Sequence, residues 1–417
     1  MEKRRVVITG MGVVAPNGIG IENFWDSLVH GRSGVRRITH FDASSYPSQI
    51  AAEVPDFNPT DYMDYRTAKR LARFAQFALA ASKMAIDDSD IDLSREDPFR
   101  VGVFIGTAIG GGDVIETQTA IFFEKGLKRL NPFSSISICT HLATGAICYK
   151  FGLKGPNTTI ASGCNSGLDA VYLAYNTIRS KDADVMVVGA GEAPINPVTF
   201  AVFCVGPGFL SRGNGNPKEA LKPYDKDRDG TVLGEGGAVV IMEELEHALA
   251  RKAHIYGEIL GYASGNESYD LFEIDPSGEA ASTIIKKALE NANLKPKDIE
   301  YINSHGNGAG NYDVNETKAI KKVFKELAYN IPISSIKPVT GQSFSTTGIF
   351  QLITCLSVFK KNIIPPTINI RNPDNECDLD FVPNRFRTAT VNTALINAHG
   401  FGGSHSIVIV GKFKPDK

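Results

Sequence analysis

Residues 158–167 read TTIASGCNSG and join a short run of β-branched residues to a helical pattern. The run over 157–161 predicts a buried strand, because threonine and isoleucine favour extended backbone. The apolar positions over 166–179 recur at helical spacing and predict an amphipathic helix. Small residues between them predict a tight turn with Cys164 at its apex. A strand that turns directly into a helix indicates an α/β fold.

The same alternation of strands and helices continues along the chain. In the first part, we expect strands over 5–9, 100–105, 157–161, 184–189 and 238–243, and a further helix over 70–86. In the second part, we expect strands over 255–262, 299–303, 331–335, 393–397 and 406–412, with helices over 283–292 and 348–360. This alternation predicts an α/β architecture with largely parallel sheets.

Two pairs of similar segments predict an internal duplication. Residues 77–112 and 282–310 each run from a helix through a proline-containing turn and a strand to a Gly-rich loop. The motifs GEGG at 234–237 and GFGG at 400–403 each precede an apolar strand. We therefore expect two similar halves, 1–252 and 253–417, related by a pseudo-twofold axis and with loops converging on one site.

The composition is that of an ordinary globular chain. Of 417 residues, 42% are hydrophobic, and 44 Lys and Arg stand against 46 Asp and Glu, for a net charge of −2. This balance excludes the basic excess on which nucleic-acid binding relies. The six cysteines are scattered without a CxxC pair, which favours a reducing cytoplasm over a disulfide scaffold. We expect no signal peptide, no membrane span and no metal site, because none has its sequence pattern here.

Cys164 is the candidate nucleophile. A thiol at a helix N-terminus lies near the positive end of the helix dipole, which favours the reactive thiolate. Its small neighbours allow a substrate carbonyl to approach, and its own backbone N–H suits an oxyanion hole. On the local residues alone, a buried structural cysteine is the more common case.

Polar groups that would support a nucleophile lie in the second half. His305 begins a Gly-rich loop after a predicted strand, where catalytic groups of α/β folds commonly lie, although backbone contacts alone would also satisfy it. Asp313 and Glu316 are three residues apart and therefore share one helix face. Lys337 follows the strand over 331–335, either as a surface charge or as an ion-pair partner that orients a site.

The GFGG motif is the last candidate segment. It offers flexible backbone N–H groups, with His399 directly before it and Phe401 as an aromatic gate. The same residues also fit a plain Gly-rich turn between two strands.

Taken together, these motifs resemble the β-ketoacyl-[acyl carrier protein] synthases, a condensing branch of the thiolase superfamily. The resemblance runs from VITGMG at 7–12 to GFGG and rests on the ordered set Cys164, His305 with Gly306, and Lys337 with Gly341. The segments SGCNSGLD at 162–169 and NECDLD at 375–380 are most similar to the ketosynthase α subunit of type II polyketide synthases. The resemblance implies a thiolase-like duplicated α/β unit, layered α-β-α-β-α.

The resemblance also implies a mechanism that needs no bound cofactor. Cys164 would take an acyl chain from the phosphopantetheine arm of an acyl carrier protein, and malonyl-carrier protein would then lose CO₂ and condense with it. His305 would stabilise the enolate, and the N–H groups of Cys164 and Phe401 would hold the oxyanion. Phe401 would also gate the acyl pocket, while Lys337 would pair with Glu316 and fix the loop around His305.

The sequence departs from the family pattern at two positions of the site. The family has a second histidine after the glycine of its lysine loop, and this chain has Gln342. Glutamine still donates a hydrogen bond to an enolate oxygen, but it cannot become a cation. The residue before GFGG, an aromatic in the family, is His399, and we hypothesise that it acts as an auxiliary group that partly replaces the lost imidazole.

Four functions compete on these residues. The first is a condensing enzyme of polyketide or specialised fatty-acid assembly. The second is a non-elongating acyltransferase, loaded on Cys164 but unable to decarboxylate the extender because of Gln342. The third is a chain-length partner subunit, against which Cys164 counts, and the fourth is a thiolase, which would carry a second cysteine near the GFGG loop.

The expected partners follow from the mechanism. Carrier proteins are acidic, and Arg66, Lys69, Arg70 and Arg73 form a candidate docking patch, although a solvated helix face would look the same. The resemblance implies a homodimer or a heterodimer with a chain-length-factor-like subunit, with the strand over 157–161 near the twofold axis. The sequence specifies neither the acyl length nor the product.

Overall fold

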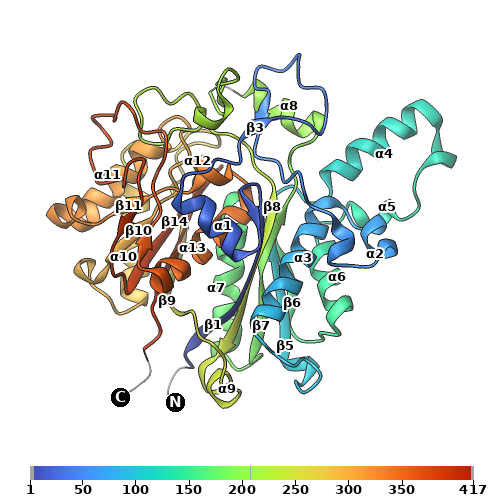
Figure 1. The fold of residues 1–417 in the computed structure, drawn as a ribbon, viewed down its shortest axis with the longest axis horizontal. Helices are drawn as coiled ribbons and strands as arrows, with labels where there is room; N and C mark the ends of the chain where they lie inside the picture. Colours follow the sequence, from blue (N-terminus) through green and yellow to red (C-terminus); the bar gives the residue numbers. More distant parts are fainter. Residues whose placement is uncertain (1–3, 207, 415–417) are drawn as a thin grey trace.

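A single large mixed sheet organises the chain in the computed structural model, which describes residues 4–206 and 208–414 (Figure 1). Its strands are β1 (Val6–Ala15), β2 (Gly18–Ile19), β5 (Val101–Gly106), β6 (Asn157–Ile160), β7 (Val185–Glu192), β8 (Gly236–Glu244), β9 (Gly257–Asn266), β10 (Tyr301–Asn303), β11 (Ile333–Ser334), β14 (Thr393–Gly400) and β15 (Ser404–Gly411). Two small antiparallel pairs lie apart from it: β3 (Arg36–Arg37) with β4 (Ile50–Ala51), and β12 (Ile363–Ile364) with β13 (Arg387–Thr388).

Helices cover the sheet on both sides and also lie between its two halves (Figure 1). The α-helices are α1 (Ile21–Val29), α2 (Tyr65–Arg70), α3 (Arg73–Asp88), α4 (Gly112–Lys125), α5 (Ser134–Ser137), α6 (Leu142–Phe151), α7 (Ser166–Arg179), α8 (Pro197–Val205), α9 (Leu245–Ala250), α10 (Glu279–Asn291), α11 (Tyr312–Phe324), α12 (Lys337–Thr340) and α13 (Thr347–Lys361). Each strand and helix expected from the sequence overlaps one of these elements, and α7 spans the predicted residues. No helix of the described chain is long and apolar enough to cross a membrane.

The order of strands reveals the duplication. From one edge to the other it runs β11-β10-β14-β15-β9-β1-β8-β7-β5-β6, and the sense of each pairing is mirrored about the β9–β1 junction. At that junction Val7 pairs with Glu258 and Ile8 with Gly257, so the halves share one continuous sheet. The predicted similarity of 77–112 and 282–310 corresponds to α3 with β5 and α10 with β10.

The expectation of largely parallel sheets is wrong. In the described chain, the parallel pairs are β5–β6, β5–β7, β10–β11 and β10–β14, and the other pairs of the large sheet are antiparallel. The three residues between β14 and β15 are too few for a crossover, so these strands form an antiparallel hairpin.

Three hydrophobic clusters give the layers α-β-α-β-α. Alternate residues of β7 face opposite sides: Val185 and Val187 pack with α3 and α6, while Met186 and Val188 pack with α7 and α13 in the middle layer. A third cluster joins α10 and α11 to the outer face of the second half. The thiolase-like layering implied by the resemblance is therefore confirmed.

Glycines allow the outer helix α3 to lie directly on the sheet. A Cβ on Gly12 would come within 2.0 Å of the Ala81 carbonyl oxygen, and one on Gly237 within 2.6 Å of the Phe77 backbone. Side chains at these positions would push α3 away, so the Gly-Met-Gly and GEGG motifs are requirements of packing at this end of the fold.

Candidate active site

Cys164 lies where β6 ends and α7 begins, as the sequence predicts. A short 3₁₀ turn, Gly163–Asn165, separates the two elements, and Gly163 has φ 68°, which favours glycine. Asn165 Nδ2 donates to Ser404 Oγ at 3.0 Å and thereby ties this turn to the GFGG loop. The nucleophile of the first half and the Gly-rich loop of the second half therefore meet at one site.

The thiolate that we expected at Cys164 is not the resting form of this group. Burial raises the pKa of the Cys164 thiol to about 11, although a hydrogen bond from Gln342 and the charge of Lys337 lower it in part. The side chain is 7% exposed, so loss of hydration outweighs the helix dipole on which the expectation rested. The thiolate forms here only when other groups stabilise its negative charge in place of water.

The ring of His305 has one defined tautomer. The backbone N–H of His399 donates to His305 Nδ1 at 3.1 Å, and Lys337 Nζ lies 3.5 Å from the same atom. Both partners are donors, so Nδ1 holds a lone pair and the ring proton is on Nε2. His305 Nε2 is buried without a protein partner and is therefore an available donor. Burial and the charge of Lys337 hold the pKa of His305 well below its usual value, so the ring is neutral.

Lys337 acts through His305 and not through the predicted ion pair with Glu316. Its ammonium group donates to the backbone carbonyl of His305 as well as facing Nδ1 of the ring. The Lys337 side chain is fully buried, and burial lowers its pKa to about 8 despite the opposing charge of Glu316. The two charges attract each other across the His305 backbone without direct contact.

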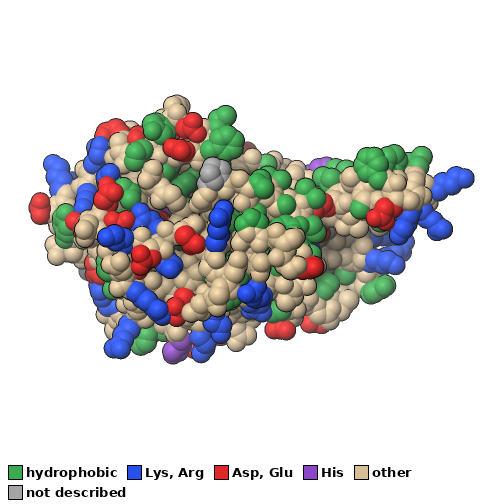
Figure 2. All heavy atoms as spheres, turned by 90° about the horizontal axis from the view of Figure 1, so that it is seen from above, with side chains coloured by type: hydrophobic (Ala, Val, Ile, Leu, Met, Phe, Trp, Pro, Cys, Tyr) green, Lys and Arg blue, Asp and Glu red, His purple; other side chains and the backbone are tan. Residues whose placement is uncertain are grey.

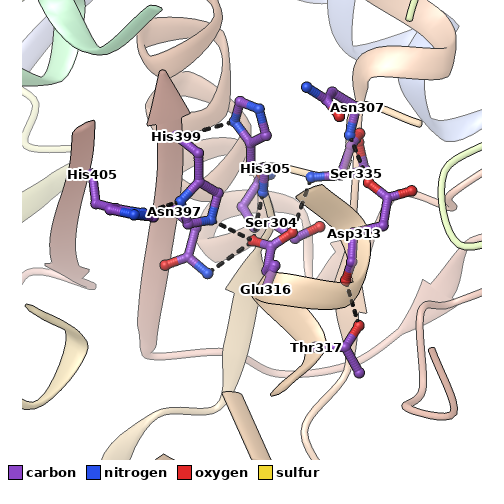
Figure 3. Close-up of polar contacts among 12 residues, drawn as sticks. Ser304, His305, Asn307, Asp313, Glu316, Thr317, Ser335, Asn397, His399 and His405 are labelled. Atoms are coloured by element: carbon purple, nitrogen blue, oxygen red, sulfur yellow. Dashed lines mark hydrogen bonds and ion pairs between the residues drawn. The ribbon is translucent and has the colours of Figure 1, made fainter. Parts of the chain in front are cut away.

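Glu316 fixes the loop that carries His305 (Figure 3). Its carboxylate accepts N–H groups of His305 at 2.7 Å and Gly306 at 3.0 Å, the hydroxyl of Tyr224 at 2.8 Å and Nδ2 of Asn397 at 2.8 Å. Burial would raise its pKa, but the nearby His399 ring and these backbone N–H groups lower the pKa to about 2. The charge of Glu316 is therefore permanent and structural.

Asp313 performs the same task one helical turn earlier. It accepts N–H groups from Asn307 at 3.1 Å, Gly308 at 3.2 Å and Tyr224 at 2.8 Å. Asp313 and Glu316 are both buried on one face of α11, as their spacing predicts.

Gln342 contacts the nucleophile directly. Its side chain is 1% exposed, and its amide N–H donates to the Cys164 thiol, while Oε1 has no protein partner. The backbone holds it on both sides, through Val232 O at 2.8 Å and the N–H of Gly234 at 2.9 Å. Gln342 is thus a neutral donor fixed beside the reacting sulfur.

His399 does not face the reacting sulfur as an auxiliary donor would. Its Nδ1 is hydrogen-bonded to Nδ1 of His405, and its Nε2 lies 3.8 Å from Glu316 Oε1. Both ring nitrogens thus point into the protein, and the hydrogen bond from His399 to His305 comes from the backbone N–H. The geometry contradicts our hypothesis that this ring replaces the lost imidazole.

Phe401 lines a cavity of about 490 Å³. It is 37% exposed, and its ring packs against Phe209 at 4.6 Å and Phe203 at 6.3 Å between centroids. Phe401 is therefore partly open to solvent, and its role as a gate stays a prediction. Apolar side chains from α8 and the segment after β9 also line the cavity, among them Val202, Phe203, Leu271, Phe272 and Ile274.

The predicted basic patch is only partly available. Arg66 and Lys69 are exposed on α2, and Arg70 is half-buried with its guanidinium 4.2 Å from the centre of the Phe133 ring. Arg73 instead forms two hydrogen bonds to the Glu235 carboxylate, at 2.6 and 2.9 Å. We correct the patch to Arg66, Lys69 and Arg70.

Sequence reasoning missed His405 and Glu267, which adjoin the site. Glu267 Oε2 lies 2.9 Å from His405 Nε2, and the side chains of both are fully buried. A hairpin about the GFGG turn places position 399 opposite position 405. Recognising this hairpin in the sequence would have predicted that His405 lies beside His399. Glu267 comes from the distant end of β9 and had no local signal.

Comparison with known proteins identifies the family of this chain. Residues 3–248 match the family described as "Beta-ketoacyl synthase, N-terminal domain", and residues 256–371 match "Beta-ketoacyl synthase, C-terminal domain". This chain belongs to the β-ketoacyl synthase family.

Its similarity to family members extends over nearly the whole chain. It is 40% identical over 412 residues to "3-oxoacyl-[acyl-carrier-protein] synthase 2" of Coxiella burnetii, with 99% of each chain covered. It is 41% identical over 414 residues to "Putative polyketide beta-ketoacyl synthase 1" of Streptomyces halstedii, with 98% of each covered. The chain is thus similar to both fatty-acid and polyketide members.

Solved structures of polyketide ketosynthases share the fold. One is described as "AntDE:AntF (apo): type II PKS acyl-carrier protein in complex with its ketosynthase bound to the hexaketide" and has a TM-score of 0.92 at 34% identity, covering 99% of this chain and 100% of that one. "The ishigamide ketosynthase/chain length factor" has a TM-score of 0.93 at 30% identity, with the same coverage.

Proposed function

We propose that this protein catalyses the decarboxylative Claisen condensation of a Cys164-bound acyl chain with malonyl-[acyl carrier protein], in polyketide or specialised fatty-acid assembly. The observation that carries the proposal is the pair of neutral donors in the buried site. His305 offers an Nε2–H without a protein partner, and Gln342 holds its amide beside the Cys164 sulfur. Neutral donors in a dry site stabilise an anion that develops during the reaction.

The first step moves an acyl group onto the enzyme. The Cys164 thiol attacks the carrier thioester, the acyl–sulfur bond to the carrier breaks, and the carrier leaves as a thiol that takes the proton of Cys164. Backbone N–H groups of Cys164 and Phe401 support the tetrahedral oxyanion. Gln342 and the charge of Lys337 assist the approach to thiolate by partly offsetting the effect of burial.

The second step makes the carbon–carbon bond. Malonyl-carrier protein loses CO₂, and the electron pair of the broken bond forms an enolate whose oxygen accepts from His305 Nε2–H and Gln342. The enolate carbon attacks the Cys164 thioester, the bond to sulfur breaks, and the released thiolate takes a proton from solvent. The products are a β-ketoacyl-carrier protein, CO₂ and the Cys164 thiol.

The acyl carrier protein is the expected partner at α2. Arg66 and Lys69 are exposed there, and Arg70 joins the helix to Phe133. An acidic carrier would be attracted to this patch. Related structures support the proposal, since one is described as a carrier protein in complex with its ketosynthase.

A second chain is the expected partner at β6 and the neighbouring arm formed by residues 112–138. β6 lies at one end of the sheet with an open edge, and exposed apolar side chains of the arm include Ile115, Phe122, Phe123, Leu127 and Ile136. Figure 2 shows hydrophobic side chains along the projecting arm and Lys or Arg side chains at its end. We infer pairing with a second copy or with a chain-length-factor-like subunit. Phe123→Asp should yield monomers in light scattering if the copies pair; a wild-type monomer would require the second kind of subunit.

Intact-mass measurement tests the reaction. The protein is incubated with acyl-carrier protein and then with malonyl-carrier protein, with Cys164→Ala as the control. We expect an adduct on Cys164 that disappears as a β-ketoacyl product forms. An adduct that persists beside intact malonyl-carrier protein, also after a partner subunit is supplied, would identify the non-elongating acyltransferase instead.

A further inference from the structure

Four buried titratable side chains form a row behind His305. Glu267 Oε2 contacts His405 Nε2 at 2.9 Å, the Nδ1 atoms of His405 and His399 share a hydrogen bond, and His399 Nε2 lies 3.8 Å from Glu316 Oε1. The β14–β15 hairpin places His399 directly opposite His405. Figure 3 shows His405 and His399 on the same side of His305, with His399 the nearer of the two. The centre of the His399 ring lies 5.0 Å from that of the His305 ring.

The contacts determine how many protons the two rings hold. His405 Nε2 faces a carboxylate, so it carries a proton. The facing Nδ1 atoms need one proton between them, because two lone pairs would repel and two protons would clash. His399 Nε2 faces the ionised Glu316, which favours a third proton there. Three protons on two imidazoles make one positive charge.

Charge balance supports the same count. The side chains of Glu267 and Glu316 are almost fully buried, and two buried carboxylates require compensating cations. Lys337 supplies one positive charge, and the histidine pair supplies the second. Burial and the charge of His399 lower the pKa of His405 to about 4, so the pair takes no further proton at neutral pH.

We propose that Glu267 and His405 are positioning residues that hold one extra proton on the His399–His405 pair and thereby place a buried cation behind His305. The cation opposes protonation of the His305 ring, which keeps its Nε2–H available as a neutral donor. It also makes that N–H a stronger donor to the enolate, because a nearby positive charge favours loss of electron density from the ring. The proposal rests on the condensing function above.

Other charged groups surround the row. The buried Asp313 on α11 is compensated separately by Arg228, whose Nε lies 3.7 Å from its carboxylate. From α12, Lys337 faces His305 Nδ1; from α11, Glu316 faces His399, and Tyr312 lies with its ring centre 5.9 Å from that of His305. Cys164 adds only a thiol at neutral pH, since burial raises its pKa to about 11. The charge of Lys337 therefore stays in place when the His399–His405 pair is altered. A change measured at His305 can then be attributed to the pair.

Nitrogen NMR of the wild-type protein labelled in histidine tests the proton count without any substitution. We expect the His399 and His405 signals to show three bound protons between pH 6 and 8, including one N–H shared by the two Nδ1 atoms. Two neutral rings over that range would overturn the proposal. Assignment uses His405→Asn, which removes one signal set.

Paired variants test the effect on His305. His405→Asn removes the second ring and its contact with Glu267, the two features that hold the extra proton on the pair, but leaves Glu267 buried and unpaired, so we expect a lower melting temperature. Adding Glu267→Gln restores charge balance, and this double variant should recover stability and load Cys164 within twofold of wild type. Its condensation rate should decline as the pH is lowered, as in wild type. The pH at which this decline begins should be about one unit higher than in wild type. His254→Asn, at an exposed position, is the control.

The outcomes separate the proposal from the function on which it rests. A double variant that loads normally and whose condensation rate begins to decline at the same pH as in wild type would overturn the positioning role. If the double variant does not fold, the NMR proton count decides alone. If the wild-type protein loads but never condenses, the condensing function fails, while the NMR result still stands for or against the buried cation.

Discussion

Replacing Gln342 by methionine tests the central chemical claim, that a neutral amide suffices beside Cys164. Methionine has nearly the same length and volume but no N–H, so packing changes little. Gln342 is 1% exposed, so bulk water does not reach this position to replace the lost donor. Loss of one donor to a developing oxyanion costs about 3 kcal/mol, so condensation should slow about a hundredfold.

The assay separates the two steps of the reaction. Loading is followed by intact mass after mixing with acyl-carrier protein, and condensation by release of CO₂ from malonyl-carrier protein on preloaded enzyme. Loading should fall less than condensation, because the loading oxyanion is held by backbone N–H groups and not by Gln342. Gln342→Glu keeps the shape but adds an anion, and should condense at least as slowly as Gln342→Met.

Two results would refute this reasoning. Unchanged condensation in Gln342→Met would show that His305 alone holds the enolate. An equal loss in both steps would show that Gln342 serves the nucleophile only, through its contact with the thiol.

Three further predictions concern docking, ionisation and packing. The double variant Arg66→Glu/Lys69→Glu should raise KM for carrier-bound substrate about tenfold and reduce its salt dependence, measured by steady-state kinetics; an unchanged KM would place docking elsewhere. Alkylation of Cys164 by iodoacetamide should accelerate with rising pH towards about 11, because burial raises the thiol pKa; a rate already constant from pH 7 would contradict this. Phe350→Ala should lower the free energy of unfolding in urea by about 3–5 kcal/mol, since this ring is fully buried and packs 5.4 Å from Phe24; a loss below about 1 kcal/mol would refute the assigned packing.

Local patterns predicted the elements of this fold better than their direction. The β-branched runs and helical spacings predict strands and helices, because the spacing of apolar residues along the chain depends on which faces of an element are buried. Whether two strands run parallel depends on the connection between them, and the pattern of alternation alone suggested crossovers throughout. The GFGG turn, with only Phe401 to Gly403 between strands, is one of the places where the chain departs from that expectation.

The site shows the same division between local and distant information. Cys164 and His305 were identifiable because each lies where a strand ends at a Gly-rich turn. The ionisation of Cys164 was mispredicted, because a helix terminus is visible in sequence whereas the depth of burial is set by segments hundreds of residues away. The contact of Lys337 with the His305 carbonyl depends on the approach of two separate strands, so no spacing could specify it.

The junction of β1 with β9 has a consequence for how the chain reaches its native state. Val6 pairs with Glu244, and Val7 pairs with both Glu243 and Glu258, so the N-terminal strand finds its partners more than half a chain away. Closing such long loops costs conformational entropy before the hydrogen bonds between the paired strands form and offset it. High contact order therefore slows folding. During synthesis β1 therefore has only its short local pairing with β2 until β8 and then β9 emerge, and the central ladder of the sheet is completed late.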